Sequence, residues 1–242
     1  MRAVEDIHKA SCKTYGSPRI LAELKGLGIP CSKSRLERLM KKHGIRAKTR
    51  RKFRITTDSK HKFPVAPNIL ERNFSPVAPN VAWGGDITYV WTKEGWLFLA
   101  VIIDLFSRQV VGWSMDERIT RNLTLNALRM AINRRNPAPG LVHHTDRGSQ
   151  YASGDYQTML RVHKMICSMS RKGNCWDNAP VESFFHTLKT EMIYWEEFGT
   201  REAARRKIFE WIEVFYNRQR RHSTLGNLSP VNFEIANLKQ CA

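Results

Sequence analysis

Residues 81–104, VAWGGDITYVWTKEGWLFLAVIID, decide the fold of this chain. β-branched and aromatic residues fill two runs, Val81–Val90 and Trp96–Asp104, and Lys93-Glu94-Gly95 separates them as a turn. A third run of the same kind, Gln109–Ser114, follows after one more short turn. Because consecutive strands joined by short turns pair antiparallel, we expect these three runs to form a meander at one side of a sheet.

Helical and strand-like segments alternate downstream of this meander. The order β-β-β-α-β-α-β-α is typical of an α/β fold in which helix crossovers add parallel strands to an antiparallel half. We therefore predict a ribonuclease-H-like mixed sheet with flanking helices over residues 81–235, followed by a tail at 236–242. The expected elements are a helix at Arg121–Asn133, a strand at Gly140–His144, a helix at Gly154–His163, a strand at Met165–Met169, and helices at Val181–Tyr194 and Arg201–Asn217.

Residues 1–45 are predicted to form a small all-α domain of three short helices. Ser17-Pro18 is a helix-start signal, Ser32 is a candidate cap for the next helix, and Gly44 is its stop. Two short helices joined by a turn, the second of them basic, favour a helix-turn-helix DNA-binding domain over a solvated helix face. The basic side chains expected on the outer face of the second helix are Arg35, Arg38, Lys41 and Lys42.

Charge is distributed unevenly along the chain. The formal net charge is +18, and residues 1–72 hold 19 Lys and Arg against 6 Asp and Glu, whereas residues 73–242 hold 21 against 16. Such an excess predicts a polyanionic partner, most often nucleic acid. Residues 46–80 combine basic residues with four prolines, so we expect an extended connector that follows a phosphate backbone. Its densest basic segment contains Arg50, Arg51 and Lys52.

The absence of cysteine pairs, of a long apolar run and of a signal peptide indicates the cellular compartment. The five cysteines are odd in number and none stands in a Cys-x-x-Cys pair, which favours a reducing environment over a disulfide framework. The longest apolar run, Leu97–Ile103, is far shorter than the roughly 20 residues of a membrane span. The first residues carry no signal-peptide pattern. We therefore expect a cytoplasmic protein with no membrane partner.

Three carboxylates stand where a carboxylate needs an explanation. Asp86 lies inside an apolar strand, Asp146 ends another strand, and Glu182 opens a helix. Such a cluster would suit Mg²⁺ or Mn²⁺, two of which activate and stabilise oxygens at phosphorus. Taken singly, Asp86 is also explained as a strand-end turn residue and Glu182 as a charge at the positive end of a helix dipole. Asp104 is a rival for the site, but it is better placed to cap the following turn through Ser107 or Arg108.

Four strings occur in the order Trp83–Tyr89, His143–Tyr151, Asp177–Lys189 and Tyr216–Gly226. Together they resemble the OrfB transposases of the IS-three family of insertion sequences, which are retroviral-integrase-like DDE enzymes. Thirty-five residues separate Asp146 from Glu182, the spacing that this family shows, and Lys189 matches its Lys/Arg position. The resemblance runs from about Tyr15 to Pro230, nearly the whole chain.

The resemblance implies that Asp86, Asp146 and Glu182 are catalytic and hold Mg²⁺ or Mn²⁺, as two ions. It implies a transposase that cleaves DNA and joins a 3′-hydroxyl to a phosphodiester by direct in-line attack. The partners it implies are transposon terminal inverted repeats, target DNA, other copies of the chain as a homo-oligomer, and a separate OrfA protein. It also implies a bacterial, nucleoid-associated location. Family members usually carry a further helical segment before the string at Tyr15. The resemblance therefore implies that this chain is a shorter gene product, a fragment or a trimmed form of a family member.

Further DNA contacts are expected around the carboxylates. On a helix, Glu182, His186 and Lys189 share one face, so Lys189 and His186 are placed to touch a phosphate, and so is Arg147 beside Asp146. For Trp176, core packing is weighed slightly above stacking on DNA. Phosphate contact and plain solvation are weighed evenly for the basic run at Arg218–His222.

Two other classes of function compete with the transposase. One is a DNA-binding regulator without catalysis, which the three intact carboxylates argue against. The other is a ribonuclease H or structure-specific nuclease, because a fold alone does not set the substrate. Lys189 and the basic N-terminal region favour transposition over the nuclease.

Overall fold

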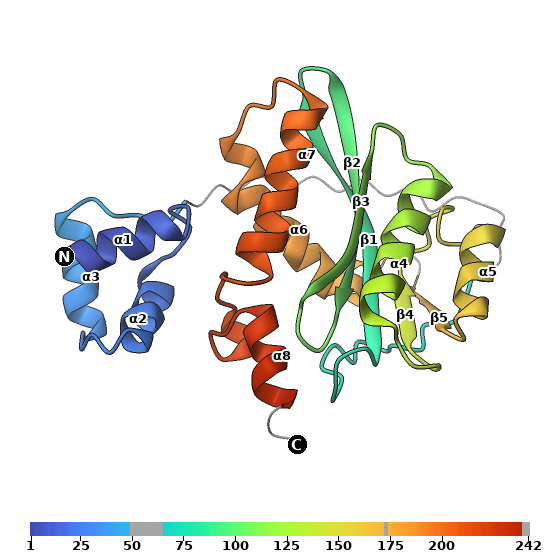
Figure 1. Ribbon diagram of the computed structural model, residues 1–242, viewed down its shortest axis with the longest axis horizontal. Coiled ribbons are helices and arrows are strands. Elements are labelled where there is room, and N and C mark those ends of the chain that lie inside the picture. The colour runs from blue at the N-terminus through green and yellow to red at the C-terminus, as the bar shows by residue number, and fades with distance from the viewer. Residues whose placement is uncertain (49–64, 172–173, 239–242) are drawn as a thin grey trace.

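The computed structural model describes all of the chain except residues 49–64, 172–173 and 239–242 (Figure 1). Three helices come first: α1 (Arg2–Ala10), α2 (Ser17–Gly26) and α3 (Lys33–Lys42). The α3 start is capped as expected, since the Ser32 hydroxyl accepts a hydrogen bond from the Arg35 amide at 3.3 Å. Apolar side chains from all three helices are buried together, and the four basic side chains predicted for the outer face of α3 are exposed.

A five-stranded mixed sheet forms the centre of the remaining chain, as predicted. Its strand order is β3-β2-β1-β4-β5. The pairs β1–β2 and β2–β3 are antiparallel, whereas β1–β4 and β4–β5 are parallel. The strands are β1 (Ala82–Thr92), β2 (Gly95–Asp104), β3 (Val110–Asp116), β4 (Val142–Thr145) and β5 (Ile166–Met169).

Helices cover both faces of this sheet (Figure 1). On one face, α4 (Arg121–Arg135) and α5 (Gly154–Val162) pack on a core that includes Trp83. On the other, α6 (Ala179–Glu191) and α7 (Arg201–Glu210) pack on a core that includes Leu99. Two buried layers around one sheet supply the rigid frame on which the acidic residues stand.

The C-terminal helices depart from the predicted elements. The helix expected over Arg201–Asn217 changes at Trp211 from α7 into a π-helix, Trp211–Tyr216, whose wider turn buries Phe215 and Tyr216 together. A further helix, α8 (Pro230–Leu238), crosses the predicted boundary between residues 235 and 236. Its apolar residues do not recur at a clear helical spacing, so the sequence pattern did not predict it. Polar contacts attach this helix to the domain: Glu234 accepts from the Ser107 hydroxyl and pairs with Arg135 at 2.8 Å.

The second half of the predicted connector packs on the protein. Leu70 is buried, and the amides of Ile69 and Leu70 donate to the Ser168 hydroxyl at 2.9 and 3.2 Å. The amide of Met169, at the end of β5, donates to the Pro67 carbonyl at 3.3 Å. Residues 67–70 therefore lie along β5, whereas the Phe74 carbonyl accepts from Arg108 at 2.9 Å and the Asn80 amide donates to Asp104 at 2.7 Å, near the end of β2. Arg50, Arg51 and Lys52 lie outside the described residues. In the part of the chain described, no helix is long and apolar enough to span a membrane.

Candidate active site

The register of two parallel strands brings Asp86 and Asp146 together. Gly85 of β1 pairs with Thr145, the last residue of β4, so Asp86 and Asp146 are the next residues on adjacent strands. Beyond this point β4 no longer covers the edge of β1. The Gly148 amide donates to Asp146 Oδ1 at 2.9 Å, and the Ile87 amide donates to Asp86 Oδ1 at 2.7 Å. Both carboxylates are half-buried and anchored by backbone.

Glycine in β1 allows the start of α6 to lie against the same strand. A Cβ atom at Gly84 would stand 2.8 Å from Val181 Cγ2, closer than packed carbon atoms approach. The side-chain amide of Asn178 donates to the Gly85 carbonyl at 3.5 Å. Since Glu182 is in the first turn of α6, this close approach puts the third carboxylate beside β1.

The other two carboxylates act on the ionisation of Asp86. Burial raises the pKa of Asp86 well above its usual range, and the negative charges of Asp146 and Glu182 raise it further. The Ile87 amide and the Lys189 ammonium oppose that rise. Burial also raises the pKa of Glu182. A concentration of carboxylates that resists ionisation is what a bound cation would relieve.

The donor set fits a hard divalent cation by its chemistry. The three side chains offer only carboxylate oxygens, which Mg²⁺ and Mn²⁺ prefer. A buried hydroxyl, that of Tyr151, stands near Asp86 and Asp146 without a hydrogen-bond partner among the described residues. As the side chains stand, no three His, Cys, Asp or Glu side chains in the described ranges are close enough to enclose an ion. Closing around one therefore requires the carboxylates to turn toward each other.

Lys189 follows the acidic residues along α6 and is half-buried. Its Nζ lies 4.8 Å from the centroid of the Tyr89 ring on β1. Burial lowers the pKa of Lys189, while Tyr89 and the charge of Asp86 raise it. His186 is exposed on the same helix. Sequence reasoning missed the contact of Lys189 with Tyr89, because a residue three positions after Asp86 in a strand is expected on the opposite face of the sheet.

Arg147 and the two histidines before Asp146 are held by the sheet. Arg147 Nε donates to the Ser170 carbonyl at 2.7 Å. His143 Nε2 lies 2.7 Å from the Tyr156 hydroxyl, and burial together with the charge of His144 lowers its pKa to about 3. His144 bonds to the hydroxyls of Ser168 and Ser170, and burial lowers its pKa to about 4. Both imidazoles are structural and neutral near pH 7.

The loop before α6 is fixed by a buried ion cluster that the sequence did not predict. The Asp177 side chain is 0 % exposed and accepts from Arg171, Arg72 and Asn68 at 2.8 to 3.1 Å. These donors hold the pKa of Asp177 below its usual range, with the Arg171 hydrogen bond the largest cause. Beside it Trp176 is 69 % exposed, so the prediction of core packing for this residue was wrong.

Arg220 and Arg221 form ion pairs within the protein, which was neither of the two roles predicted for them. Arg220 is buried and pairs with Glu191 at 2.6 Å, and Arg221 pairs with Glu23 of α2 at 2.6 Å. Arg19, also of α2, pairs with Glu191 at 3.3 Å. These ion pairs join the N-terminal helices to the sheet-bearing part of the chain.

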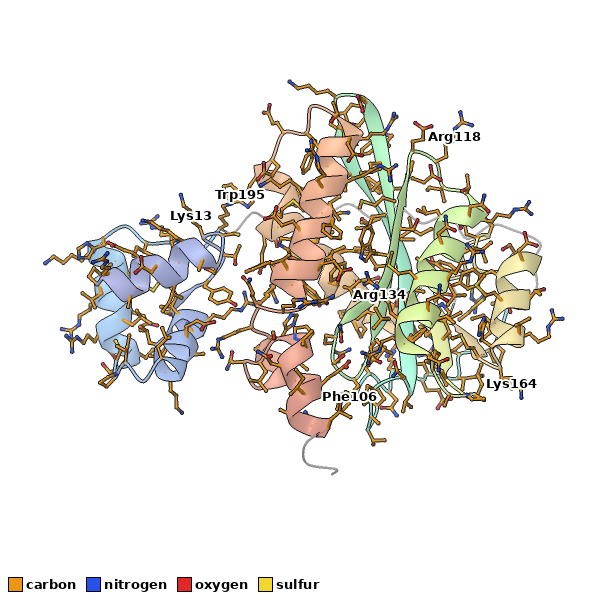
Figure 2. All side chains as sticks on the ribbon, viewed as in Figure 1. Lys13, Phe106, Arg118, Arg134, Lys164 and Trp195 are labelled. Atoms are coloured by element: carbon orange, nitrogen blue, oxygen red, sulfur yellow. The ribbon has the colours of Figure 1, made fainter. Side chains whose placement is uncertain are left out.

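A cation–ring contact marks another point of this junction. Figure 2 places Trp195 on the side that faces the N-terminal helices, and Lys48 Nζ lies 5.5 Å from its ring centroid. The Tyr15 hydroxyl accepts from the Arg221 amide at 2.7 Å. The junction thus combines these polar contacts with apolar packing, because buried residues of the N-terminal helices and of the α6–α7 face of the sheet belong to one apolar cluster.

Family models match almost the whole chain. Residues 1–53 match a model described as an HTH-like domain, and residues 76–175 and 182–238 match two models described as integrase core domains. Together with the mixed sheet and its acidic edge, these matches define the class as an integrase-type polynucleotidyl transferase.

Curated relatives identify the family within this class. The chain is 50% identical over 228 residues to "Transposase InsF for insertion sequence IS3A" of Escherichia coli (strain K12), covering 94% of this chain and 79% of the relative. It is also 50% identical over 226 residues to "Insertion element IS600 uncharacterized 31 kDa protein" of Shigella sonnei, covering 93% and 83%. The chain belongs to the IS-three (IS3) family of insertion-sequence transposases, as the four strings predicted.

Solved structures agree on the fold. A chain of the simian T-cell lymphotropic virus intasome in complex with PP2A regulatory subunit B56 gamma matches with a TM-score of 0.56 and 18% identity, covering 96% of this chain and 74% of that one. The dimeric HTLV-2 integrase catalytic core in complex with magnesium matches with a TM-score of 0.50 and 20% identity, covering 65% and 98%. The retroviral-integrase-like fold is thus confirmed.

Proposed function

We propose that this transposase cleaves DNA at the ends of its insertion sequence and joins the resulting 3′-hydroxyl to a target phosphodiester at Asp86, Asp146 and Glu182. The observation that carries the proposal is the placement of these three residues on neighbouring elements, at β1, directly after β4 and in the first turn of α6, beside the edge of β1 that β4 leaves open. Their donor chemistry matches the metals used for phosphoryl transfer.

The three carboxylates are assigned as ligands of two Mg²⁺ or Mn²⁺ ions. When bound, such ions activate the attacking oxygen and stabilise the leaving oxygen at phosphorus. The backbone amides that hold Asp86 and Asp146 fix where these carboxylates stand. Lys189 is assigned to a phosphate near the reacting end, because its half-buried ammonium faces Tyr89 and forms no ion pair among the described residues.

Positioning of the DNA is assigned to surfaces around the site. His186 is exposed on α6, and the half-buried Arg147 is oriented by the Ser170 carbonyl, so both are assigned to phosphates of the bound DNA. We assign residues 1–45 to a helix-turn-helix domain, 46–80 to a basic connector and residues 81–238, through the end of α8, to the catalytic domain. The basic residues assigned to DNA outside the catalytic part are Arg35, Arg38, Lys41 and Lys42 on α3, and Arg50, Arg51 and Lys52 in the connector.

The proposal extends to partners. Terminal inverted repeats and target DNA are the substrates of a reaction that joins one DNA to another, so the protein works at the nucleoid. Two transposon ends must meet before both are joined, which calls for at least two copies of the chain. The match to an intasome chain supports a multimer on DNA. An OrfA protein encoded beside this chain is the proposed protein partner.

A strand-transfer assay tests this function. Labelled duplex from the inverted repeats flanking the gene is incubated with plasmid and the whole chain, in Mg²⁺, in Mn²⁺ or with EDTA. Joined products that require the metal support the proposal. DNA binding without joining under every condition would favour a regulator, and nicking of DNA or of RNA–DNA hybrid without joining would favour a nuclease. Adding purified OrfA in parallel separates a missing partner from missing chemistry.

A further inference from the structure

Tyr151 closes the turn that follows Asp146. Its amide donates to the Gly148 carbonyl at 3.0 Å, so the chain folds back directly after the carboxylate. A Cβ atom at Gly148 would lie 3.0 Å from Asp146 Oδ1 and 3.5 Å from Tyr151 Cδ2. The Tyr151 ring and the Asp146 carboxylate therefore flank the same glycine.

The hydroxyl of Tyr151 is buried and unsatisfied. The residue is 3 % exposed, and its oxygen has no hydrogen-bond partner among the described residues. Buried hydroxyls nearly always have such a partner, because leaving water without one costs free energy. A second buried tyrosine makes the contrast plain: Tyr156, whose ring packs edge-on against Tyr151 at 5.3 Å, has its hydroxyl 2.7 Å from His143 Nε2.

Tyr151 lies beside the acidic residues of the site, since its ring and the Asp146 carboxylate both contact the position of a Gly148 Cβ atom. Burial is the largest cause that raises the pKa of Tyr151, and Asp86, Tyr156 and Asp146 raise it further. The hydroxyl therefore stays protonated and keeps a hydrogen to donate. Carboxylates that bind a metal are themselves oriented by hydrogen bonds from a surrounding layer of donors.

We infer that Tyr151 is a positioning residue, whose buried hydroxyl donates a hydrogen bond to the Asp86 carboxylate once the three carboxylates turn to take up a divalent cation. The inference rests on the proposed function, since it concerns the same site. Backbone amides already hold Oδ1 of both aspartates, and Asp86 is the partner because its charge acts on Tyr151 more strongly than that of Asp146. One more donor then fixes the orientation of the Asp86 carboxyl group. The unsatisfied hydroxyl is thereby explained as half of a hydrogen bond that the loaded site completes.

Thermal melting of Tyr151→Phe across a titration of Mg²⁺ or Mn²⁺ tests the inference, with Tyr156→Phe as the matched control. Without metal, Tyr151→Phe should melt at or above the wild-type temperature, because the lost hydroxyl had no partner. The metal concentration that gives half of the thermal shift should rise roughly tenfold or more, the usual effect of removing such a donor. Tyr156→Phe should lower the melting temperature and leave that metal concentration unchanged.

Strand transfer in the same variants completes the test. Joining by Tyr151→Phe should fall at low metal concentration and recover at high concentration. An unchanged metal midpoint, or a lower melting temperature without metal, would overturn the inference, because the hydroxyl would then be idle or already engaged in the fold. If wild type neither joins DNA nor responds to metal, the proposed function fails instead, so the two failures are distinguishable.

Discussion

Gly84→Ala probes the distance between β1 and α6, on which the site depends. The added Cβ atom would stand 2.8 Å from Val181 Cγ2 and 3.2 Å from Leu105 Cδ2. Val181 is fully buried, so it has no free space into which to turn. Relief to an ordinary carbon–carbon contact of about 3.5–4 Å requires the start of α6 to move by roughly 1 Å. Glu182, the next residue, moves with it.

Both stability and activity should respond. Overpacking of this kind costs about 1–3 kcal/mol, and for a chain of this length each 1 kcal/mol lowers the melting temperature by about 2–4 °C. The expected drop is thus about 2–12 °C. A misplacement of about 1 Å at a reacting site costs on the order of 10²-fold in rate. Strand transfer at a temperature where the variant is fully folded should therefore fall by about two orders of magnitude.

Two further glycines separate these effects. Gly154→Ala meets no atom within 4 Å and should match wild type in both melting and joining. Gly112→Ala would overlap the Ala127 carbonyl oxygen on the α4 face, so it should destabilise the fold while any folded molecules join DNA at the normal rate. Full joining by folded Gly84→Ala would refute the idea that this close approach sets the position of Glu182.

Three other outcomes are expected. Arg220→Gln leaves a buried carboxylate with only Arg19 and should cost about 3 kcal/mol in urea unfolding, whereas the exposed Arg218→Gln should cost nothing measurable; equal costs would contradict the ion-pair account. Because the pKa values of His143 and His144 are lowered in the folded protein, the unfolded state takes up protons at a higher pH than the folded state does. The free energy of unfolding should therefore be at its full value above pH 6.5 and fall toward pH 4, by up to about 1.4 kcal/mol per pH unit for each imidazole. His143→Gln should flatten that slope in urea titrations at different pH values. Neutralising three connector residues should weaken binding to all DNA sequences and reduce the slope of log affinity against log salt by up to about 2.7, while an unchanged slope would mean that they make no phosphate contact. These residues are Arg50, Arg51 and Lys52.

Local pattern predicted most of the elements in this fold. Alternating strands, helix caps and turn residues placed β1 to β5 and α2 to α7 because these signals act over a few residues. The acidic residues also followed from local rules, since an Asp within an apolar strand and an Asp at a strand end are visible in the sequence. The spacing of Glu182 from Asp146 came from the family resemblance instead.

Contacts between distant segments could not be predicted in this way. Arg72 and Asp177 are 105 residues apart, and Val110 and Asn217, which exchange two hydrogen bonds, are 107 apart. Which charges meet depends on how the helices pack, and no periodicity records it. For this reason the basic run at Arg218–His222 was misjudged: its charges suggested solvent or phosphate, while packing turned two arginines inward.

Strand transfer by Glu182→Gln tests the central claim most directly. Glutamine keeps the size of the side chain but removes the negative charge. The proposed site requires that charge together with those of Asp86 and Asp146. We predict that joined products fall to background in Mg²⁺ and Mn²⁺ while binding to the terminal repeats and the melting temperature stay near wild type, and that Glu196→Gln, an exposed residue beyond α6, joins DNA normally. Joining by Glu182→Gln at a rate near that of wild type would contradict the assignment of the three carboxylates.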